Sequence, residues 1–207
     1  MKRAVIVLAG GSSERFGRDK CLIELSGKPL ILHVLDKLAS VADEKVVVTG
    51  SDYQRERVAF LLKFGVRVII DKYEGHSPLV GALTGFETVE NEYALLLPCD
   101  TPFVSVEIAM LLLDLCVNRS AAIPRWPNGY IEPLQAAYNT KNAISAAEKA
   151  LEKGEHKMLS MINYMRGVRY VSTLVLQQYD AKLLSFFNVN TPQDLKRAES
   201  ILQRRRE

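Results

Sequence analysis

The segment Leu8–Lys20 combines adjacent glycines with basic side chains, a set of residues that can hold phosphate groups. Gly10 and Gly11 lack a Cβ atom, so their backbone N–H groups can come close to an anion. Arg15 and Lys20 supply the positive charge that a triphosphate requires. The segment contains neither G-x-G-x-x-G nor the Gly-Lys-Ser/Thr of a P-loop, which excludes those two phosphate-binding motifs. A Gly-Gly pair alone is typical of an ordinary turn, so the basic residues carry the prediction of a phosphate-binding loop.

A second candidate is Asp100, in the turn Pro98-Cys99-Asp100-Thr101-Pro102 that follows an apolar run. The two prolines stiffen this turn. A carboxylate at a rigid strand end suits Mg²⁺, which takes few protein oxygens and completes its shell with phosphate and water. Taken without the glycine-rich segment, the carboxylate could equally cap the turn. Cys99 is better explained as a small buried side chain than as a nucleophile, because no base accompanies it.

A third candidate combines Asp71, which follows a run of β-branched residues, with Gly81 in a segment that begins at Pro78. The carboxylate could accept hydrogen bonds from a base or a ribose. Gly81 would let a flat ring approach the backbone. Ordinary turn chemistry explains the same residues equally well.

These candidates lie on a chain in which apolar runs alternate with segments of helical period. This pattern predicts a three-layer, Rossmann-like α/β fold, with a mostly parallel central sheet and helices on both faces. The expected strands are Val5–Leu8, Val46–Val48, Val66–Ile70, Ala94–Leu97, Ala121–Ile123, Leu134–Tyr138 and Val168–Ser172. Helices are expected after Gly27-Lys28-Pro29, after an Asp52 cap, over Pro78–Val89, over Val106–Val117, from a Thr140 cap to Gly154, over Lys157–Arg166, and after a Thr191 cap. Ligands of such sheets bind beyond the carboxyl ends of the strands, where all three candidates fall.

The composition narrows the classes of partner. A length of 207 residues suits one domain, expected to span residues 1–207. A net charge of +3 argues against a nucleic-acid partner. The N-terminal apolar run Ala4–Leu8 is too short to span a membrane. Cys21, Cys99 and Cys116 form no CxxC pair, which favours a reducing cytoplasm over a disulfide framework or a zinc site.

Four segments resemble the molybdenum cofactor guanylyltransferases, a family of the nucleotidyltransferase superfamily. They are Leu8-Ala9-Gly10-Gly11 through Asp19-Lys20, Pro78-Leu79-x-Gly81, Pro98-Cys99-Asp100-Thr101-Pro102 and Asn188-Val189-Asn190-Thr191-Pro192. Relatives that use other nucleotides commonly carry alanine at the position of Gly10. The molybdopterin cytidylyltransferases tend to carry Gly-Asp-Gln-Pro where this chain has Pro98-Cys99-Asp100-Thr101. Both differences favour guanine, and the absent methyl group at Gly10 would leave room for a purine.

The resemblance implies transfer of GMP from GTP to molybdopterin, with release of pyrophosphate and with Mg²⁺ as the cofactor. The residues expected to bind the nucleotide are Leu8, Ala9, Gly10, Gly11, Lys20, Asp71, Gly81 and Asp100. Arg15, Lys20 and Asp100 are the expected catalytic residues, with Asp100 also the metal ligand. Asn188 and Asn190 match positions linked to the pterin end of the site.

Several alternatives remain open at this point. An enzyme of the same fold could transfer CMP to molybdopterin or a nucleotide to a sugar phosphate. A GTP-binding adaptor without catalysis could deliver the cofactor. Transient partners would be proteins of molybdenum cofactor biosynthesis or recipient molybdoenzymes.

Overall fold

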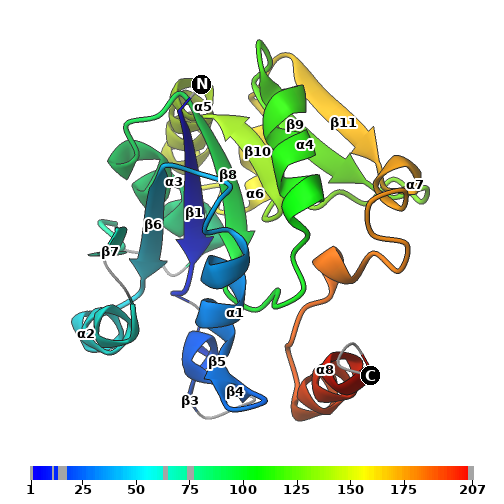
Figure 1. The fold of residues 1–207 in the computed structure, drawn as a ribbon. Coiled ribbons are helices and arrows are strands. Elements are labelled where there is room, and N and C mark those ends of the chain that lie inside the picture. The colour runs from blue at the N-terminus through cyan, green and yellow to red at the C-terminus, as the bar shows by residue number, and fades with distance from the viewer. Residues whose placement is uncertain (1, 11, 14–17, 63–64, 74–76, 205–207) are drawn as a thin grey trace.

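A seven-stranded sheet lies at the centre of the computed structural model, which describes residues 2–10, 12–13, 18–62, 65–73 and 77–204 (Figure 1). From one edge to the other, its strands are β11 (Val168–Ser172), β9 (Ala121–Arg125), β10 (Ala136–Asn139), β8 (Tyr93–Pro98), β1 (Arg3–Leu8), β6 (Glu44–Thr49) and β7 (Val66–Ile70). β10 runs antiparallel to both of its neighbours, and the other neighbouring strands of the sheet run parallel. The predicted mostly parallel sheet is confirmed.

Helices cover both faces of the sheet, so the predicted three-layer α/β architecture is confirmed (Figure 1). One face packs against α3 (Pro78–Thr88), α5 (Thr140–Glu152) and α6 (Met158–Asn163). The other packs against α1 (Leu30–Lys37) and α4 (Val106–Cys116), with one buried apolar residue each from α2 (Asp52–Leu61) and α7 (Thr173–Leu176). Among the described ranges, no helix combines the length and the apolar character needed to cross a membrane.

The central strand β1 shows why the sheet needs cover on both faces. Val5 and Val7 belong to the cluster that contains α1 and α4, whereas Ala4 and Ile6 belong to the cluster that contains α3 and α5. All four side chains are fully buried. Successive residues of a strand point to opposite faces, so a continuous apolar run fits a strand that is covered on both sides.

A third, smaller cluster joins the C-terminal helix α8 (Pro192–Arg204) to the segment after β1. Ala198 of α8 packs there with Leu25 and Leu30. That segment contains two short ribbons and a 3₁₀ turn: β2 (Ser12–Ser13) with β3 (Arg18–Asp19), η1 (Lys20–Leu22), and β4 (Glu24–Leu25) with β5 (Lys28–Pro29). A second 3₁₀ turn, η2 (Leu184–Phe186), leads towards α8. Sequence patterns did not predict these small elements or α7.

Two predicted helix caps are wrong by one residue. The α2 cap is Ser51, whose Oγ accepts from the Gln54 backbone N–H at 3.2 Å, and Asp52 is the first residue of the helix. The α5 cap is Asn139, whose Oδ1 accepts from the Asn142 backbone N–H at 3.1 Å, and Thr140 is the first residue of the helix. In both cases the cap residue has a non-helical backbone and a side-chain oxygen that reaches the first turn.

The predicted cap at Thr191 is confirmed. Its Oγ1 accepts from the Asp194 N–H at 3.1 Å, and the Asp194 carboxylate accepts from the Thr191 N–H at 2.9 Å. Two predicted elements are longer than those observed. The helix expected over Lys157–Arg166 ends at Asn163, and the strand expected from Leu134 begins at Ala136.

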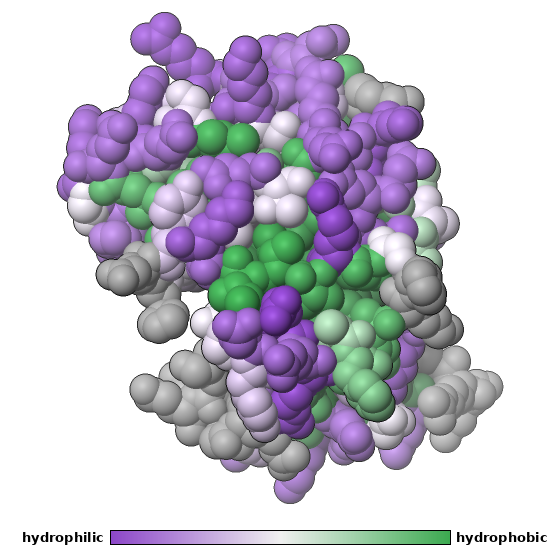
Figure 2. Space-filling model, turned by 90° about the vertical axis from the view of Figure 1, so that its left-hand side faces the viewer, coloured by the Kyte–Doolittle hydropathy of each residue, from purple (hydrophilic) through white to green (hydrophobic). Residues whose placement is uncertain are grey.

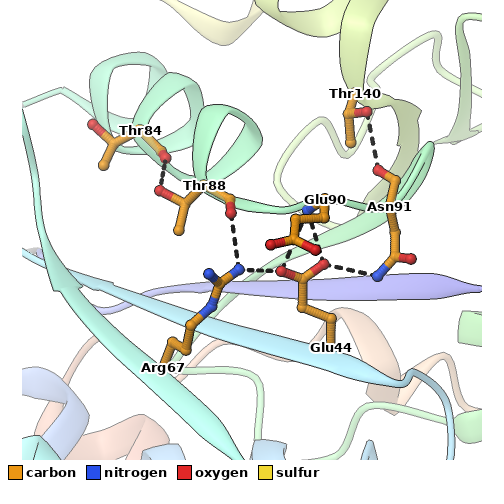
Figure 3. Close-up of polar contacts among 7 residues, drawn as sticks. All are labelled: Glu44, Arg67, Thr84, Thr88, Glu90, Asn91 and Thr140. Atoms are coloured by element: carbon orange, nitrogen blue, oxygen red, sulfur yellow. Dashed lines mark hydrogen bonds and ion pairs between the residues drawn. The ribbon is translucent and has the colours of Figure 1, made fainter.

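The amino end of the sheet is held together by a hydrogen-bonded network around Glu44, the first residue of β6 (Figure 3). The Glu44 carboxylate pairs with Arg67 of β7 and accepts from the Glu90 N–H at 3.0 Å and from Asn91 Nδ2 at 2.7 Å. Thr140 Oγ1 donates to the Asn91 carbonyl at 3.1 Å. The network therefore joins two strands to the end of α3 and the start of α5.

The side of the molecule on which β7 ends the sheet is apolar in its middle. Figure 2 shows hydrophobic residues gathered there, with hydrophilic residues predominating above and below them. β7 contributes half-buried apolar residues to this side, among them Val66 and Val68. The sheet edge at β7 is thus only partly covered by helices.

Candidate active site

A cavity of about 270 Å³ lies at the carboxyl ends of four neighbouring strands. Leu8 of β1, Val48 of β6 and Pro98 of β8 line it from the strands themselves. Asp71, directly after β7, lines it from the sheet edge, and Leu134 lines it from the chain before β10. The predicted location of the site, beyond the carboxyl ends of the strands, is the location of this cavity.

Hydrogen bonds of the sheet continue past the strand ends and fix the residues that follow. The Cys99 N–H donates to the Leu8 carbonyl at 3.0 Å, and the Asp71 N–H donates to the Thr49 carbonyl at 2.8 Å. Asp71 and the turn that carries Asp100 are therefore held by the same framework as the strands. This rigidity is what a group that positions a ligand requires.

Lys20 and Asp100 form an ion pair at the cavity wall, although they lie far apart in the sequence. The Lys20 ammonium donates to Asp100 Oδ2 and also to Asn190 Oδ1. The Val189 N–H donates to the Asp100 carbonyl at 2.9 Å. The structure thus brings together the predicted Lys20, Asp100 and Asn190. Asn188 lies beside Val189, and its Oδ1 is buried without a hydrogen-bond partner among the described residues.

The Asp100 carboxylate has one oxygen left over for a ligand. Its Oδ2 pairs with Lys20, whereas its Oδ1 is buried and accepts no hydrogen bond within the described part of the chain. A buried carboxylate oxygen without a partner is costly, so a cation or a donor at this position would be stabilising. The described residues contain no group of three or more His, Cys, Asp or Glu side chains placed to hold a metal ion. A metal bound to Asp100 would thus draw most of its ligands from phosphate and water, the coordination typical of Mg²⁺.

Asp71 is oriented by a threonine of α3. Thr84 Oγ1 donates to Asp71 Oδ1 at 2.7 Å and accepts from the Lys72 N–H at 3.1 Å. The other oxygen, Asp71 Oδ2, is 3.6 Å from the position that a Cβ atom on Gly81 would occupy. A side chain at Gly81 would also lie 3.5 Å from Leu8 Cδ2, so it would fill space between residues that line the cavity.

Comparisons with known proteins agree with this geometry. Residues 5–168 match the family described as MobA-like NTP transferase domain. The chain belongs to this family. It is 35% identical over 199 residues to a Methanosarcina mazei protein named "Probable molybdenum cofactor guanylyltransferase", covering 94% of this chain and 88% of that protein. A Bacillus anthracis protein of the same name is 36% identical over 201 residues, covering 97% of this chain and 98% of that protein.

A solved structure is similar to this MobA-like domain over almost its whole length. It is the molybdopterin-guanine dinucleotide biosynthesis protein A from Archaeoglobus fulgidus. The two chains share 32% identity with a TM-score of 0.83, and the match covers 97% of this chain and 99% of the other. The family resemblance drawn from the four sequence segments is confirmed.

In this MobA-like domain, the absence of a side chain at Gly10 allows a contact between two loops, whereas the sequence interpretation was room for a purine. A Cβ atom on Gly10 would lie 3.2 Å from the backbone nitrogen of Gly50, and one on Gly50 would lie 3.0 Å from the Gly10 carbonyl oxygen. Both glycines line the cavity. The absent methyl group therefore lets the two loops come into contact at the cavity wall. Any effect of Gly10 on a bound purine would act through this contact.

The end of β6 and the cap of α3 supply residues of the cavity that sequence reasoning missed. Thr49 and Gly50 line the cavity, as does Ser77 at the start of α3. The rule that ligands bind beyond strand ends applies to the Val-Val-Val-Thr-Gly run that ends in Gly50. This run contains no charged residue, so its sequence gives no signal for a ligand-binding role.

Cys99 lines the cavity, and both Cys99 and Cys21 are buried. The hydrogen bond to Cys21, together with burial, raises the pKa of the Cys99 thiol well above its ordinary value. A protonated, buried thiol is a poor nucleophile, which supports the structural interpretation of Cys99.

The remaining predicted residues divide into two groups. Ala9 is fully buried, and its carbonyl accepts from Gln54 Nε2 at 2.7 Å, so Ala9 anchors the start of the glycine-rich loop to α2. Gly11 and Arg15 lie outside the described residues, and their roles stay predictions.

Proposed function

We propose that this protein transfers GMP from GTP to molybdopterin and releases pyrophosphate, forming the guanine dinucleotide form of the molybdenum cofactor. The observation that carries the proposal is the Lys20–Asp100 pair at the strand-end cavity of a MobA-like domain, with the Asn190 side chain on the same lysine. The names of the similar proteins supply the identity of the nucleotide and the acceptor.

The proposed reaction is a displacement at the α-phosphorus of GTP. An oxygen of the terminal phosphate of molybdopterin forms a bond to this phosphorus, and the bond from the phosphorus to the oxygen that bridges to the β-phosphate breaks. Pyrophosphate leaves with the electron pair of that bond. The attacking phosphate is already anionic, so the reaction needs no general base. Its barrier arises mainly from charge repulsion and alignment.

Lys20 is placed to reduce both parts of this barrier. Its ammonium group lies between the Asp100 carboxylate and Asn190, which belongs to the segment expected at the pterin end. We propose that it neutralises phosphate charge where nucleotide and acceptor meet. Asp100 would hold Mg²⁺, which when bound supplies further neutralisation of the triphosphate. Arg15 is proposed to contribute a second positive charge.

Base and ribose recognition is proposed for the opposite side of the cavity. Asp71 Oδ1 is fixed by Thr84, which leaves Oδ2 beside Gly81 as the oxygen placed to accept from the nucleoside. The backbone at Gly10 and Gly50 would face the same part of the ligand. Asn188 is proposed to bind the acceptor substrate, molybdopterin, because its buried Oδ1 has no hydrogen-bond partner among the described residues.

We further propose that the 207 residues act as one domain in the cytoplasm, with transient contacts to molybdenum cofactor biosynthesis proteins or recipient molybdoenzymes. Cys21, Cys99 and Cys116 are all free and buried, which fits a reducing compartment.

The function is tested by assaying the purified protein with molybdopterin, Mg²⁺ and each of GTP, CTP, ATP and UTP. Pyrophosphate release is measured, and the product is identified by mass spectrometry. We expect turnover with GTP and a product one GMP unit heavier than the acceptor. A preference for CTP, or transfer to a sugar phosphate in place of molybdopterin, would replace the proposal with another reaction of the same fold. Tight GTP binding without any transfer would indicate a delivery adaptor.

A further inference from the structure

Gln54, in the first turn of α2, is a buried polar residue at the back of the cavity, with only 4% of its surface exposed. Its Oε1 accepts from the Gly50 N–H at 2.8 Å. Its Nε2 donates to the Ala9 carbonyl at 2.7 Å and lies 3.5 Å from Cys21 Sγ. One amide group therefore contacts three separate segments of the chain.

The chemistry of these contacts requires an amide. The Ala9 carbonyl can only accept a hydrogen bond and the Gly50 N–H can only donate one, so the side chain must offer one donor and one acceptor at fixed positions. Glutamine does this with a single planar group. A glutamate of the same shape would place an oxygen against the Ala9 carbonyl, and an apolar side chain would leave both backbone groups without a partner.

Two of the three contacts of Gln54 lie at the close approach of Gly10 and Gly50. Gly50 belongs to this approach, and Ala9 directly precedes Gly10. Cys21 directly follows Lys20, whose ammonium must reach Asp100. A shift in any of these segments would move a residue that lines the cavity.

We propose that Gln54 is a positioning residue for nucleotide binding, which clamps the two glycine loops together and fixes the segment that carries Lys20. Gln54 is not among the described residues that line the cavity, so its proposed role is to position residues that are. The proposal rests on the proposed function in one respect, that the cavity holds a nucleoside triphosphate. It adds a residue of α2 to the site.

The test compares Gln54→Glu with Asn91→Asp, two changes of a buried or half-buried amide to an acid. Asn91 donates to Glu44 at the opposite end of the sheet, so its variant loses a similar donor away from the cavity. GTP affinity is measured by titration with Mg²⁺ at a temperature well below the unfolding midpoint of each variant, and kcat and KM are measured for pyrophosphate release. Gln54→Met, which has the same length but no donor or acceptor, is tested in parallel and replaces Gln54→Glu if that variant does not fold.

We expect Gln54→Glu to weaken GTP binding about tenfold, with the change mainly in KM, because GTP would have to order loops that Gln54 no longer holds, at a cost similar to that of one buried hydrogen bond. Asn91→Asp should lower the unfolding midpoint while binding GTP as the parent does. Parent-like affinity of folded Gln54 variants, or an equal loss of affinity in Asn91→Asp, would overturn the proposal. A parent protein that prefers another triphosphate would contradict the proposed function alone, and the same comparison made with that triphosphate would still decide the role of Gln54.

Discussion

Two carboxylates mark opposite ends of the sheet, and they differ in how fully they are paired. Glu44, at the amino end, accepts from Arg67, from the Glu90 N–H and from Asn91, so both of its oxygens have partners (Figure 3). Asp100, at the carboxyl end, pairs with Lys20 through Oδ2 and leaves Oδ1 buried without a partner among the described residues. A carboxylate whose two oxygens are both paired joins secondary-structure elements, whereas a buried oxygen without a partner is an exception that a ligand would explain.

Both carboxylates border a hollow, so they differ in hydrogen-bond pairing and not in open space. Glu44 and its partners Arg67, Glu90 and Asn91 line a hollow of about 400 Å³ at the amino end of the sheet. Asp100 and Lys20 border a cavity of about 270 Å³. The Glu44 carboxylate is therefore paired within the protein, whereas Asp100 keeps a buried oxygen without a partner among the described residues.

The largest expected effect is at Asp100. Asp100→Asn should lower GMP transfer by about 10²- to 10³-fold, because it removes the charge proposed to hold Mg²⁺ against the triphosphate. The variant should stay folded, since asparagine has nearly the same shape as aspartate. Steady-state pyrophosphate release and thermal unfolding measure the two properties. Turnover close to that of the parent would remove Asp100 from the mechanism.

Lys20→Ala should produce a loss of about 10²-fold in turnover, because an ammonium group aimed at the phosphates would be missing. The same assay measures it, with Lys28→Ala as a matched control. Lys28 pairs with Asp36 on the surface, away from the cavity, so its removal should leave turnover unchanged. If both lysine variants behaved alike, the Lys20–Asp100 pair would have no special role.

Glu44→Ala tests the other end of the comparison. It should lower the free energy of unfolding by about 1–3 kcal/mol, because several donors lose their acceptor, with Arg67 contributing little since it is half exposed. Nucleotide transfer at a temperature where the variant is folded should not change. Urea denaturation measures the first quantity. An unchanged stability, or a large loss of activity in the folded variant, would contradict a purely structural role.

The smallest expected effect is at Gly10. Gly10→Ala should weaken GTP binding by about tenfold or less, since its methyl group would displace the Gly50 backbone by only a few tenths of an ångström. CTP should lose less affinity, because a pyrimidine fills less of the cavity. Titration with both nucleotides measures this difference, and an equal loss for the two would remove Gly10 from base selection.

Local patterns were sufficient to predict the main strands, the helices other than α7, and the end of the sheet at which the cavity lies. Lys20, Asp71 and Asp100 follow strands or glycines, and all three line the cavity as expected. Their meeting depends on β1 lying between β6 and β8, an order that the strands do not individually specify. The residues alone left the nucleotide and the acceptor open, and the expectation of GTP and molybdopterin came from the resemblance to a family.

The missed residues share a physical reason. Gln54 has the spacing of an ordinary polar residue on a helix surface, and only the docking of α2 behind the glycine loops buries it. Gly50 has no charge and no motif of its own, and its role appears only through contact with Gly10. The predicted caps, Asp52 and Thr140, are one residue too late. Each directly follows the true cap, Ser51 or Asn139, and is itself a good capping residue.

The most direct test of the contrast between the two carboxylates is the binding of Mn²⁺, used as a spectroscopic substitute for Mg²⁺, in the presence of GTP. Electron paramagnetic resonance titrations are made with the parent, Asp100→Asn and Glu44→Ala. We expect one tightly bound Mn²⁺ that requires GTP in the parent and in Glu44→Ala, and a loss of that site in Asp100→Asn. Equal Mn²⁺ binding by the parent and Asp100→Asn would contradict the assignment of the unpartnered Asp100 oxygen to the metal.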